Sequence, residues 1–355
     1  MISGIVLLVI AAFQVALIIG IVWLLLVTDG RMREQDQTGS DAMEVLREPL
    51  WAFQVLGDDG DAIAAALARL PPSVAARQMQ RLGGSMLAPE QLRKLALRVR
   101  NDEWVEKTLA GGKSRRWWKR MEAARLLTMV CGANDRWLLA RLVMDRHPAV
   151  ATAATAGIAA HADRALVEEL VRTLPRRSPT LRLQQMRGLK SHAKIATPTH
   201  VAALAGPLSA KDLQVMVQFG EILATPAAFS AIVRLASHPT ADVRASVARA
   251  LRAAFVPGAA DAARKLLGDP DWRVRAAAAR AIEGLRVTAA VPELSEALRD
   301  AEWWVRFRSA MALSGLGEPG RAALEKAAGA DDPYASEMAI SVSGLSEANR
   351  LDLTG

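Results

Sequence analysis

The feature that most constrains the fold is a repeat of 31 residues that runs through most of the chain. One position of the repeat, which we call position zero, is valine in four copies, and position eight is leucine or isoleucine in six of seven copies. Position zero is occupied by Lys119, Val150, Leu181, Asp212, Val243, Val274, Val305 and Ser336, and position eight by Leu127, Ile158, Leu189, Gly220, Leu251, Ile282 and Leu313. Apolar residues at this spacing lie on one face of a helix. One such helix buries too little surface to be stable alone, so the period predicts a stack of similar units.

Each unit is expected to be a hairpin of two helices. Proline and glycine residues mark the turns between them. We expect the first helices near 102–110, 134–143, 163–173, 198–206, 226–236, 259–267, 290–299 and 319–328, with a second helix around each position zero. Gly220 is the exception at position eight, and a shift of that copy by one residue would place Lys211 and Phe219 in phase.

Two segments, DPDWRVRAAAARAI (269–282) and DAEWWVRFRSAMAL (300–313), resemble HEAT repeats. They are most similar to the short bacterial type of roughly 30 residues, which also occurs in phycobilisome-lyase-like proteins and is shorter than the usual ~40. The resemblance covers about residues 100–345. It implies an all-α fold, an α-solenoid of HEAT-like hairpins whose surface binds another macromolecule. It specifies little about function, because HEAT arrays serve many functions.

Residues 2–27 contain no ionisable side chain over 26 positions. About 20 helical residues are enough to cross a bilayer. A buried core helix is rarely apolar on every face over this length, and the basic n-region of a signal peptide is missing. We therefore expect residues 1–27 to form a retained transmembrane anchor. Arg31 and Arg33 follow it, so the positive-inside rule places the solenoid on the cytoplasmic side of the cell membrane, as a single-pass protein.

The remaining domain organisation follows from composition. Residues 28–42 are polar without a hydrophobic period and are expected to be a linker. Residues 43–100 are helical in pattern but out of phase with the repeat, which predicts an N-terminal helical cap over the solenoid at 101–355. Within the cap, residues 43–57 pack against the first repeats or, alternatively, lie on the membrane surface.

No enzyme motif is present. The segment Gly112-Lys113-Ser114 resembles the end of a phosphate-binding loop, but Lys107 stands where that motif needs glycine. The five histidines have no metal-ligand spacing, and the single cysteine, Cys131, is expected to be a buried, inert thiol. We therefore expect no catalytic residues, no metal and no cofactor.

Two columns of residues are candidates for partner binding. Aspartate and arginine recur six residues apart, and HEAT-like proteins carry an Asp–Arg ladder of this kind between repeats, so the arginines either link repeats or face a partner. The tryptophans precede position zero and either pack over the preceding turn or form an exposed binding strip, because Trp and Arg are enriched at binding hot spots. The candidates are Trp117, Trp118, Trp272, Trp303, Trp304, Arg120, Arg182, Arg244, Arg275 and Arg306.

The net charge of +8 includes basic clusters at 113–120 and 172–194. Anionic lipid headgroups or an acidic partner surface would explain these clusters. Nucleic acid is the rival ligand, because some HEAT-like proteins are DNA glycosylases. It would require a basic groove, and for an enzyme a catalytic aspartate near the aromatics. The predicted anchor argues against it, because it would confine the protein to the membrane.

These observations predict a membrane-anchored scaffold or adaptor that is not an enzyme and binds a protein partner through its solenoid. A membrane enzyme such as a glycosyltransferase, or a secretion component, would give the anchor a purpose. The alternative is a nucleic-acid-binding or base-processing HEAT-like protein. A third possibility is a lyase-like helper in pigment attachment, which only the type of repeat suggests.

Overall fold

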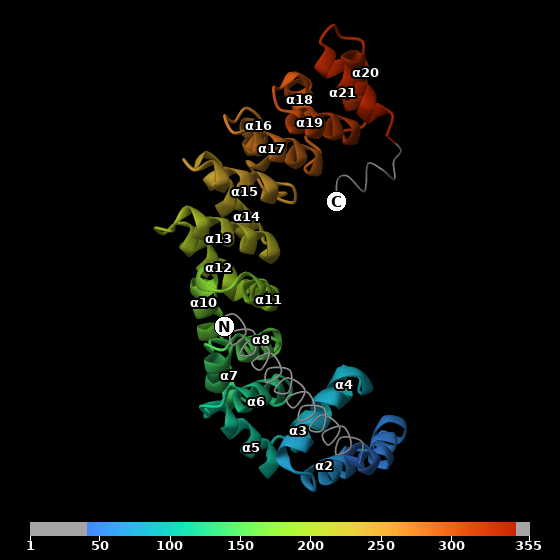
Figure 1. The fold of residues 1–355 in the computed structure, drawn as a ribbon, viewed down its shortest axis with the longest axis vertical. Coiled ribbons are helices and arrows are strands. Elements are labelled where there is room, and N and C mark those ends of the chain that lie inside the picture. Colours follow the sequence, from blue (N-terminus) through green and yellow to red (C-terminus); the bar gives the residue numbers. More distant parts are fainter. Residues whose placement is uncertain (1–40, 346–355) are drawn as a thin grey trace, which may run out of the picture. The chain divides into compact units, whose positions relative to one another are not determined.

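The computed structural model describes residues 41–345, without the side chain of Ser85, and this part of the chain contains helices and no strand. The described residues divide into two compact units, with the boundary between His161 and Ala162 (Figure 1). The predicted anchor at 1–27 and all but two residues of the predicted linker lie outside the described residues. Between residues 41 and 345, none of the helices combines the length and the apolar character that a membrane span requires.

The first unit begins with helices that do not follow the 31-residue period. The helix over 41–51 includes the last two residues of the expected linker, because Ala42 is buried in the packing of the cap. The elements are this helix, η1 (Ala52–Leu56), α2 (Asp61–Ala68), α3 (Pro72–Arg81), η2 (Leu82–Met86), α4 (Pro89–Val99), α5 (Glu103–Ala110), η3 (Gly111–Lys113), α6 (Trp117–Val130), η4 (Ala133–Asp135), α7 (Arg136–Val143), α8 (Pro148–Thr155) and α9 (Ile158–His161).

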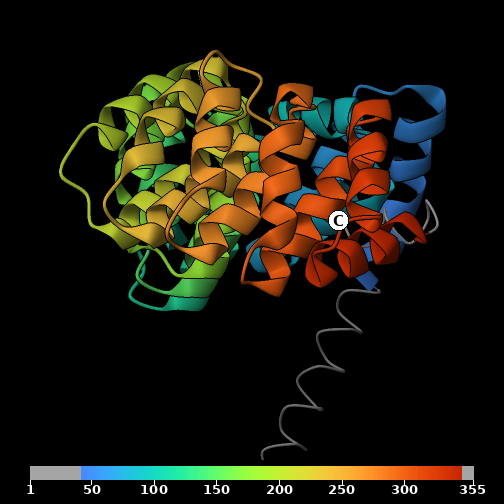
Figure 2. The same ribbon diagram turned by 90° about the horizontal axis from the view of Figure 1, so that it is seen from above.

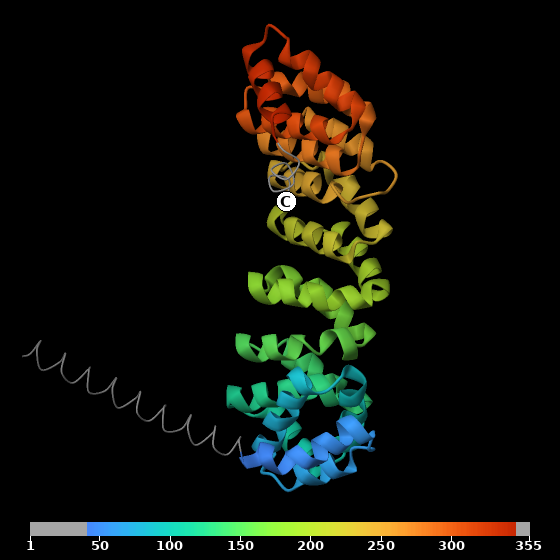
Figure 3. The ribbon, with the colours of Figure 1, turned by 90° about the vertical axis from the view of Figure 1, so that its right-hand side faces the viewer.

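The second unit consists of successive helical hairpins, as the period predicts (Figure 3). Its first helices are α10 (Arg164–Thr173), α12 (Ala193–Leu204), α14 (Pro226–Val233), α16 (Ala259–Leu267), α18 (Val291–Glu296) and α20 (Glu318–Ala328). Its second helices are α11 (Pro179–Leu189), α13 (Ala210–Leu223), α15 (Ala241–Leu251), α17 (Trp272–Gly284), α19 (Trp303–Gly315) and α21 (Pro333–Ser343). Short 3-10 turns extend several of them: η5 (Leu174–Arg176), η6 (Lys190–His192), η7 (Arg234–Ser237), η8 (Thr288–Ala290) and η9 (Ala297–Arg299).

One helix starts earlier than the sequence predicts. We expected the first helix of its hairpin near 198–206, but α12 begins at Ala193 and Pro198 lies inside it. A proline in a helix loses one backbone hydrogen bond. The remaining bounds agree closely, and α16 coincides with the range expected for it.

The helix α13 keeps the unshifted phase of the repeat. Val215, Met216 and Val217 are buried at positions three to five, and Gly220 is buried at position eight. A Cβ atom on Gly220 would lie 2.7 Å from Ile232 and 2.8 Å from the His200 ring, so neighbours already fill the space of a leucine. Position seven, which is alanine in α15, α17 and α19, is the buried Phe219 here. The proposed shift by one residue is therefore wrong, because a large residue at position seven compensates for the glycine at position eight.

From α13 to α19 the second helices pack closely on one another, most tightly α15, α17 and α19, and more closely than the first helices beside them. At the start of the unit the order is reversed, because α10 contacts α12 more than α11 contacts α13. Small side chains permit the close approach. Ala278 and Ala279 of α17 and Ser309 and Ala310 of α19 are fully buried at positions four and five. Figure 2 looks along this stack from its C-terminal end. The second helices from α13 to α19 therefore share one surface.

A basic groove and an aromatic pocket as candidate binding sites

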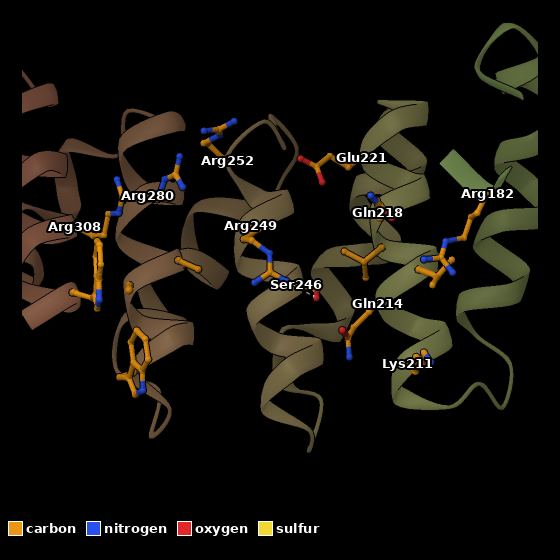
Figure 4. Close-up of a pocket in the computed structure, with 16 residues that line it drawn as sticks. Arg182, Lys211, Gln214, Gln218, Glu221, Ser246, Arg249, Arg252, Arg280 and Arg308 are labelled. Carbon is orange, nitrogen blue, oxygen red and sulfur yellow. Dashed lines mark hydrogen bonds between the residues drawn. The ribbon is translucent and has the colours of Figure 1, made fainter. Parts of the chain in front are cut away.

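A groove of about 690 Å³ lies on the second helices α11, α13, α15, α17 and α19 (Figure 4). Six cationic side chains and one acidic one line it: Arg182, Lys211, Arg249, Arg252, Arg280, Arg308 and Glu221. Trp272 and Trp304 also line it, and Val215, Val217, Ala276 and Ala277 supply apolar surface. Its volume is in the range of pockets that hold ligands. We call this surface the basic groove.

The repeat itself brings these cations together. Arg249 and Arg280 both occupy position six of their repeats, and Arg252 occupies position nine, directly after the end of α15. These positions are on the face of each second helix that the neighbouring helices leave open. Figure 4 shows Glu221 extending from α13 on the side of Arg252, and Arg249 extending toward Ser246. The side chain of Arg249 also donates a hydrogen bond to Ser246 Oγ at 2.8 Å.

The electrostatics of the groove favour an anion. Burial lowers the pKa of Arg280, and the like charge of Arg252 lowers it further. Burial likewise lowers the pKa of Arg308, with a contribution from Arg280. Burial raises the pKa of Glu221, against the opposing effect of Arg252 and Arg249. Because neighbouring cations disfavour one another's charged form, a negative group in the groove would favour the charged forms of Arg280 and Arg308, as Glu283 already does in part.

A smaller pocket of about 180 Å³ lies between α19 and α21. It is lined by Trp303, Arg306, Phe307, Tyr334, Glu337, Met338, Ser341, Val342 and Leu345. Trp303 stacks on Phe307 with ring centroids 5.0 Å apart and meets Trp304 edge-on at 4.8 Å. The guanidinium of Arg306 lies 4.9 Å from the centroid of the Tyr334 ring. We call this site the aromatic pocket.

The five candidate tryptophans are all substantially exposed, between 38% and 50%. Trp272 and Trp304 line the basic groove, and Trp303 lines the aromatic pocket. Trp117 and Trp118 lie in the first unit, where Trp117 stacks on His147 with centroids 4.3 Å apart. Four of the five, all but Trp272, thus pack against another ring. They nevertheless present large apolar faces to solvent, which a binding strip requires.

The arginine column forms the ladder that the spacing predicts. Arg275 donates from Nε and Nη2 to the Asp300 carboxylate at 2.7 Å each, and from Nη1 to the carbonyls of Asp269 and Pro270. Arg244 holds Asp269, and in the first unit Arg120 holds Asp145, in the same way. Each arginine thus joins the acid of the following repeat. These three guanidinium groups are used inside the protein.

The other two arginines of the column form no such pair within residues 41–345. For Arg182, the residue at the acid's place in the next repeat is Pro207. Arg182 instead lines the basic groove. For Arg306, the equivalent residue is Asp331, and no ion pair joins the two within the described part of the chain. Arg306 lines the aromatic pocket. The two arginines without a ladder partner are therefore the two that reach a pocket.

The ladder carboxylates are held in their charged form. Burial raises the pKa of Asp269, but hydrogen bonds from Arg244 and from the Asp271 N–H outweigh it, so the pKa lies below its ordinary value. The pKa values of Asp145 and Asp300 are lowered by the same balance. This pattern is that of a charged group fixed for structure rather than poised for proton transfer.

Three other features of the sequence were considered for chemistry: residues 112–114, Cys131 and the residue types that bind metals. Gly112-Lys113-Ser114 lies at the 3-10 turn η3 between α5 and α6, where a Cβ on Gly112 would meet Leu138 at 2.8 Å. Burial raises the pKa of the Cys131 thiol to about 11, so it stays protonated at neutral pH. Among residues 41–345, no three histidine, cysteine or acidic side chains are grouped to hold a metal ion.

Sequence reasoning missed most of the basic groove. It named Arg182, Trp272 and Trp304, but not Lys211, Arg249, Arg252, Arg280 or Arg308. The available signal was the recurrence of arginine at position six, in Arg125, Arg187, Arg249 and Arg280, of which Arg249 and Arg280 line the groove. That signal is weak because these residues are far apart in sequence and join one surface only when the repeats stack.

The model of HEAT repeats matches residues 260–343. No curated protein matches the sequence. Among solved structures, a mutant of Kap121p is similar with a TM-score of 0.50 and 10% identity, over 86% of this chain and 44% of that chain. YibA of E. coli has 18% identity and a TM-score of 0.37, over 72% of this chain and 95% of its own. The complex of CpcE and CpcF of phycocyanin lyase from Nostoc has 17% identity and a TM-score of 0.30, over 67% and 92%. The match, the helical hairpins and the ladder agree: residues 260–343 match the HEAT-repeat family, and the described part of the chain, 41–345, is helical.

Proposed function

We propose that this protein is a membrane-anchored, non-catalytic scaffold whose basic groove captures an acidic segment of a partner protein. The observation that carries the proposal is the composition of the groove. Six cations, one acid and two exposed tryptophans surround about 690 Å³ on a single continuous face. Tryptophan and arginine together are the residues that most often supply binding energy at protein interfaces.

The apolar surface of the groove favours a peptide over a nucleic acid. Val215, Val217, Ala276 and Ala277 lie among the cations, and such surface suits the side chains of a peptide. Contacts to nucleic acid go mostly to phosphates and, for single strands, to stacked bases. Nucleic acid is nonetheless the second candidate, because exposed tryptophans beside arginines also suit a single strand.

Membrane attachment is the second part of the proposal and rests on the sequence of residues 2–27. After the predicted linker at 28–42, four apolar side chains expose at least half of their surface: Val45, Trp51, Val55 and Leu56. Leu46, Leu50 and Phe53 of the same segment are buried. Exposed tryptophan and aliphatic side chains beside an anchor suit contact with the bilayer surface. We propose the cytoplasmic face of the cell membrane, with a membrane-embedded partner such as a glycosyltransferase or a secretion component.

The test uses the full-length protein in mild detergent, with nuclease-treated and untreated membranes. The variant carries Arg249→Glu and Arg252→Glu, two exposed groove residues, and the matched control carries Arg321→Glu and Lys326→Glu on α20, outside the groove. The expected result is a stoichiometric protein partner that is lost with the groove variant and kept with the control. Direct titrations with an acidic twelve-residue peptide and a single-stranded oligonucleotide accompany it. Strongly salt-dependent, groove-dependent oligonucleotide binding without a protein partner would replace the scaffold proposal by the nucleic-acid alternative.

A further inference from the structure

Each Arg–Asp pair of the ladder is one rung. Arg306 is the last arginine of the ladder, and within residues 41–345 its rung lacks the aspartate. Its Nη1 donates to the carbonyls of Asp300 and Ala301 at 2.8 and 3.0 Å, as the equivalent atom of Arg275 does one repeat earlier. In Arg244 and Arg275, Nε donates to an aspartate Oδ2 at 2.7 Å. Arg306 is only 9% exposed, and its buried Nε has no hydrogen-bond partner. A buried guanidinium N–H without an acceptor is costly.

A proline explains why the acid of the next repeat does not complete the rung. Each ladder aspartate is held in place by the backbone N–H two residues later: for Asp300 this is the N–H of Glu302, at 2.9 Å. The corresponding acid for Arg306 is Asp331, and two residues later stands Pro333, which has no N–H. Asp332 caps α21 instead, by accepting from the Ala335 N–H. Asp331 is exposed and makes no ion pair with Arg306 in the described structure.

The aromatic pocket opens beside this incomplete rung. Phe307, Met338, Val342 and Leu345 give it apolar walls, and Arg306 is its one cationic residue. At about 180 Å³ it is smaller than the sites that enclose a whole small molecule. Its size therefore suits one or two side chains of a bound peptide.

We propose that the aromatic pocket binds an aspartate or glutamate side chain of a partner protein, with an apolar neighbour of that residue against the pocket walls. The carboxylate would accept from Arg306 Nε, as Asp269 and Asp300 do from their arginines. A planar carboxylate matches the guanidinium fork. Glu337 also lines the pocket, and its charge disfavours a doubly charged phosphate more than a single carboxylate. This site is separate from the basic groove and does not depend on the function proposed for it.

The test is a titration of the full-length protein in detergent with a fluorescein-labelled, amidated peptide, Ser-Leu-Asp-Leu-Ser-Gly, followed by anisotropy. Replacing its aspartate by asparagine is expected to weaken binding about tenfold, because a charge-assisted hydrogen bond to a buried arginine is lost. The groove variant Arg249→Glu with Arg252→Glu is expected to bind this peptide like the unmodified protein. Equal affinity for the two peptides, or no binding up to millimolar concentration, would overturn the proposal.

A gain-of-rung variant tests the site without endangering the fold. Pro333→Ala restores the missing N–H, so Asp331 can be held in place and accept the hydrogen bond from Arg306 Nε. Because Asp331 then competes with the peptide carboxylate, peptide affinity should fall about tenfold. Adding Asp331→Asn in the same background should restore the affinity, because the arginine is released again. Pro319→Ala at the start of α20 is the matched control and should change nothing. If Pro333→Ala leaves the peptide affinity unchanged, Arg306 is not the binding group and the proposal fails.

Discussion

Two stretches of the second unit build the same helical hairpin by different means. From α15 to α19, buried arginines and aspartates join each repeat to the next. From α11 to α13, the ladder positions hold Pro207 and Leu213 instead of an acid and an arginine. We call these the ladder region and the middle region.

The middle region replaces charges by a packed histidine. His200 is fully buried, and its Nε2 donates to the carbonyl of Met216 at 2.8 Å. Its ring meets Phe219 edge-on, with centroids 5.6 Å apart. The hydroxyls of Thr197 and Thr225 are 3.1 Å apart and link the neighbouring first helices. The repeats can thus be stacked either by the Arg–Asp ladder or by a packed histidine. The ladder is therefore not required for the stacking.

The largest expected effect is the loss of Phe219, on which the middle region depends. Phe219→Ala should lower the free energy of unfolding by about 4 kcal/mol, because it leaves a cavity beside a glycine. Urea unfolding followed by circular dichroism measures this. Phe255→Ala is the matched control; that ring is 76% exposed, so a change below about 0.5 kcal/mol is expected. Adding Gly220→Leu to Phe219→Ala should recover part of the lost unfolding free energy. If the free-energy changes of the two single substitutions simply add in the double variant, the large residue at position seven does not compensate for the glycine at position eight.

The ladder region should respond nearly as strongly to the loss of one acid. Asp269→Asn leaves Arg244 buried without its carboxylate, which should cost about 3 kcal/mol of unfolding free energy. The same unfolding assay measures it. Asp242→Asn breaks an ion pair with Arg273 in which both side chains are about half exposed, so its effect should be below about 1 kcal/mol. Similar losses for the two substitutions would mean that the buried pair Arg244–Asp269 contributes no more to the unfolding free energy than the exposed pair Arg273–Asp242.

Acidification should separate the two regions. Burial lowers the pKa of His200 below its ordinary 6.5, although its hydrogen bond to Met216 opposes this. A histidine that is neutral in the folded state stabilises the fold above pH 6.5, and this stability is lost as the pH falls from there toward the folded pKa. The ladder aspartates also have lowered pKa values, so their contribution persists until the pH falls below about their unfolded value of 3.8.

Hydrogen exchange as a function of pH measures this difference. With intrinsic rates corrected for pH, protection of α12 and α13 should fall first, below pH 6.5, while α15 and α17 stay protected until below pH 4. His200→Gln should remove the first of these transitions and leave the second. Simultaneous loss of protection in all four helices would show that the two regions unfold as one.

The sequence predicted the fold well and the site poorly, for physical reasons that these regions illustrate. The hairpins and the ladder could be predicted because their signals are local. Position zero, position eight and the Asp–Arg spacing each involve residues within one or two consecutive repeats. The exchange of size between Phe219 and Gly220 depends on the His200 ring, which comes from another helix and gives no periodic signal. The incomplete rung at Arg306 could have been found, because Pro333 occupies the place where the earlier repeats have an N–H donor.

The smallest effect on stability is expected at Trp272, which stands in the ladder region but outside the ladder. Its side chain is 38% exposed and lines the basic groove, so Trp272→Ala should change the unfolding free energy by less than about 1 kcal/mol. If the groove binds a partner through Trp272 and Trp304, the same substitution should weaken binding of the partner about tenfold. Affinity for the acidic peptide and urea unfolding are measured on the same samples.

Trp137→Ala serves as the control for this substitution, because that ring is 51% exposed in the first unit and contacts Lys113. It should change neither stability nor affinity by much. If Trp272→Ala instead destabilises the protein as much as Asp269→Asn does, the tryptophan belongs to the packing of its turn. The ladder region would then use aromatic packing as well as charge, and the difference from the middle region would be one of degree.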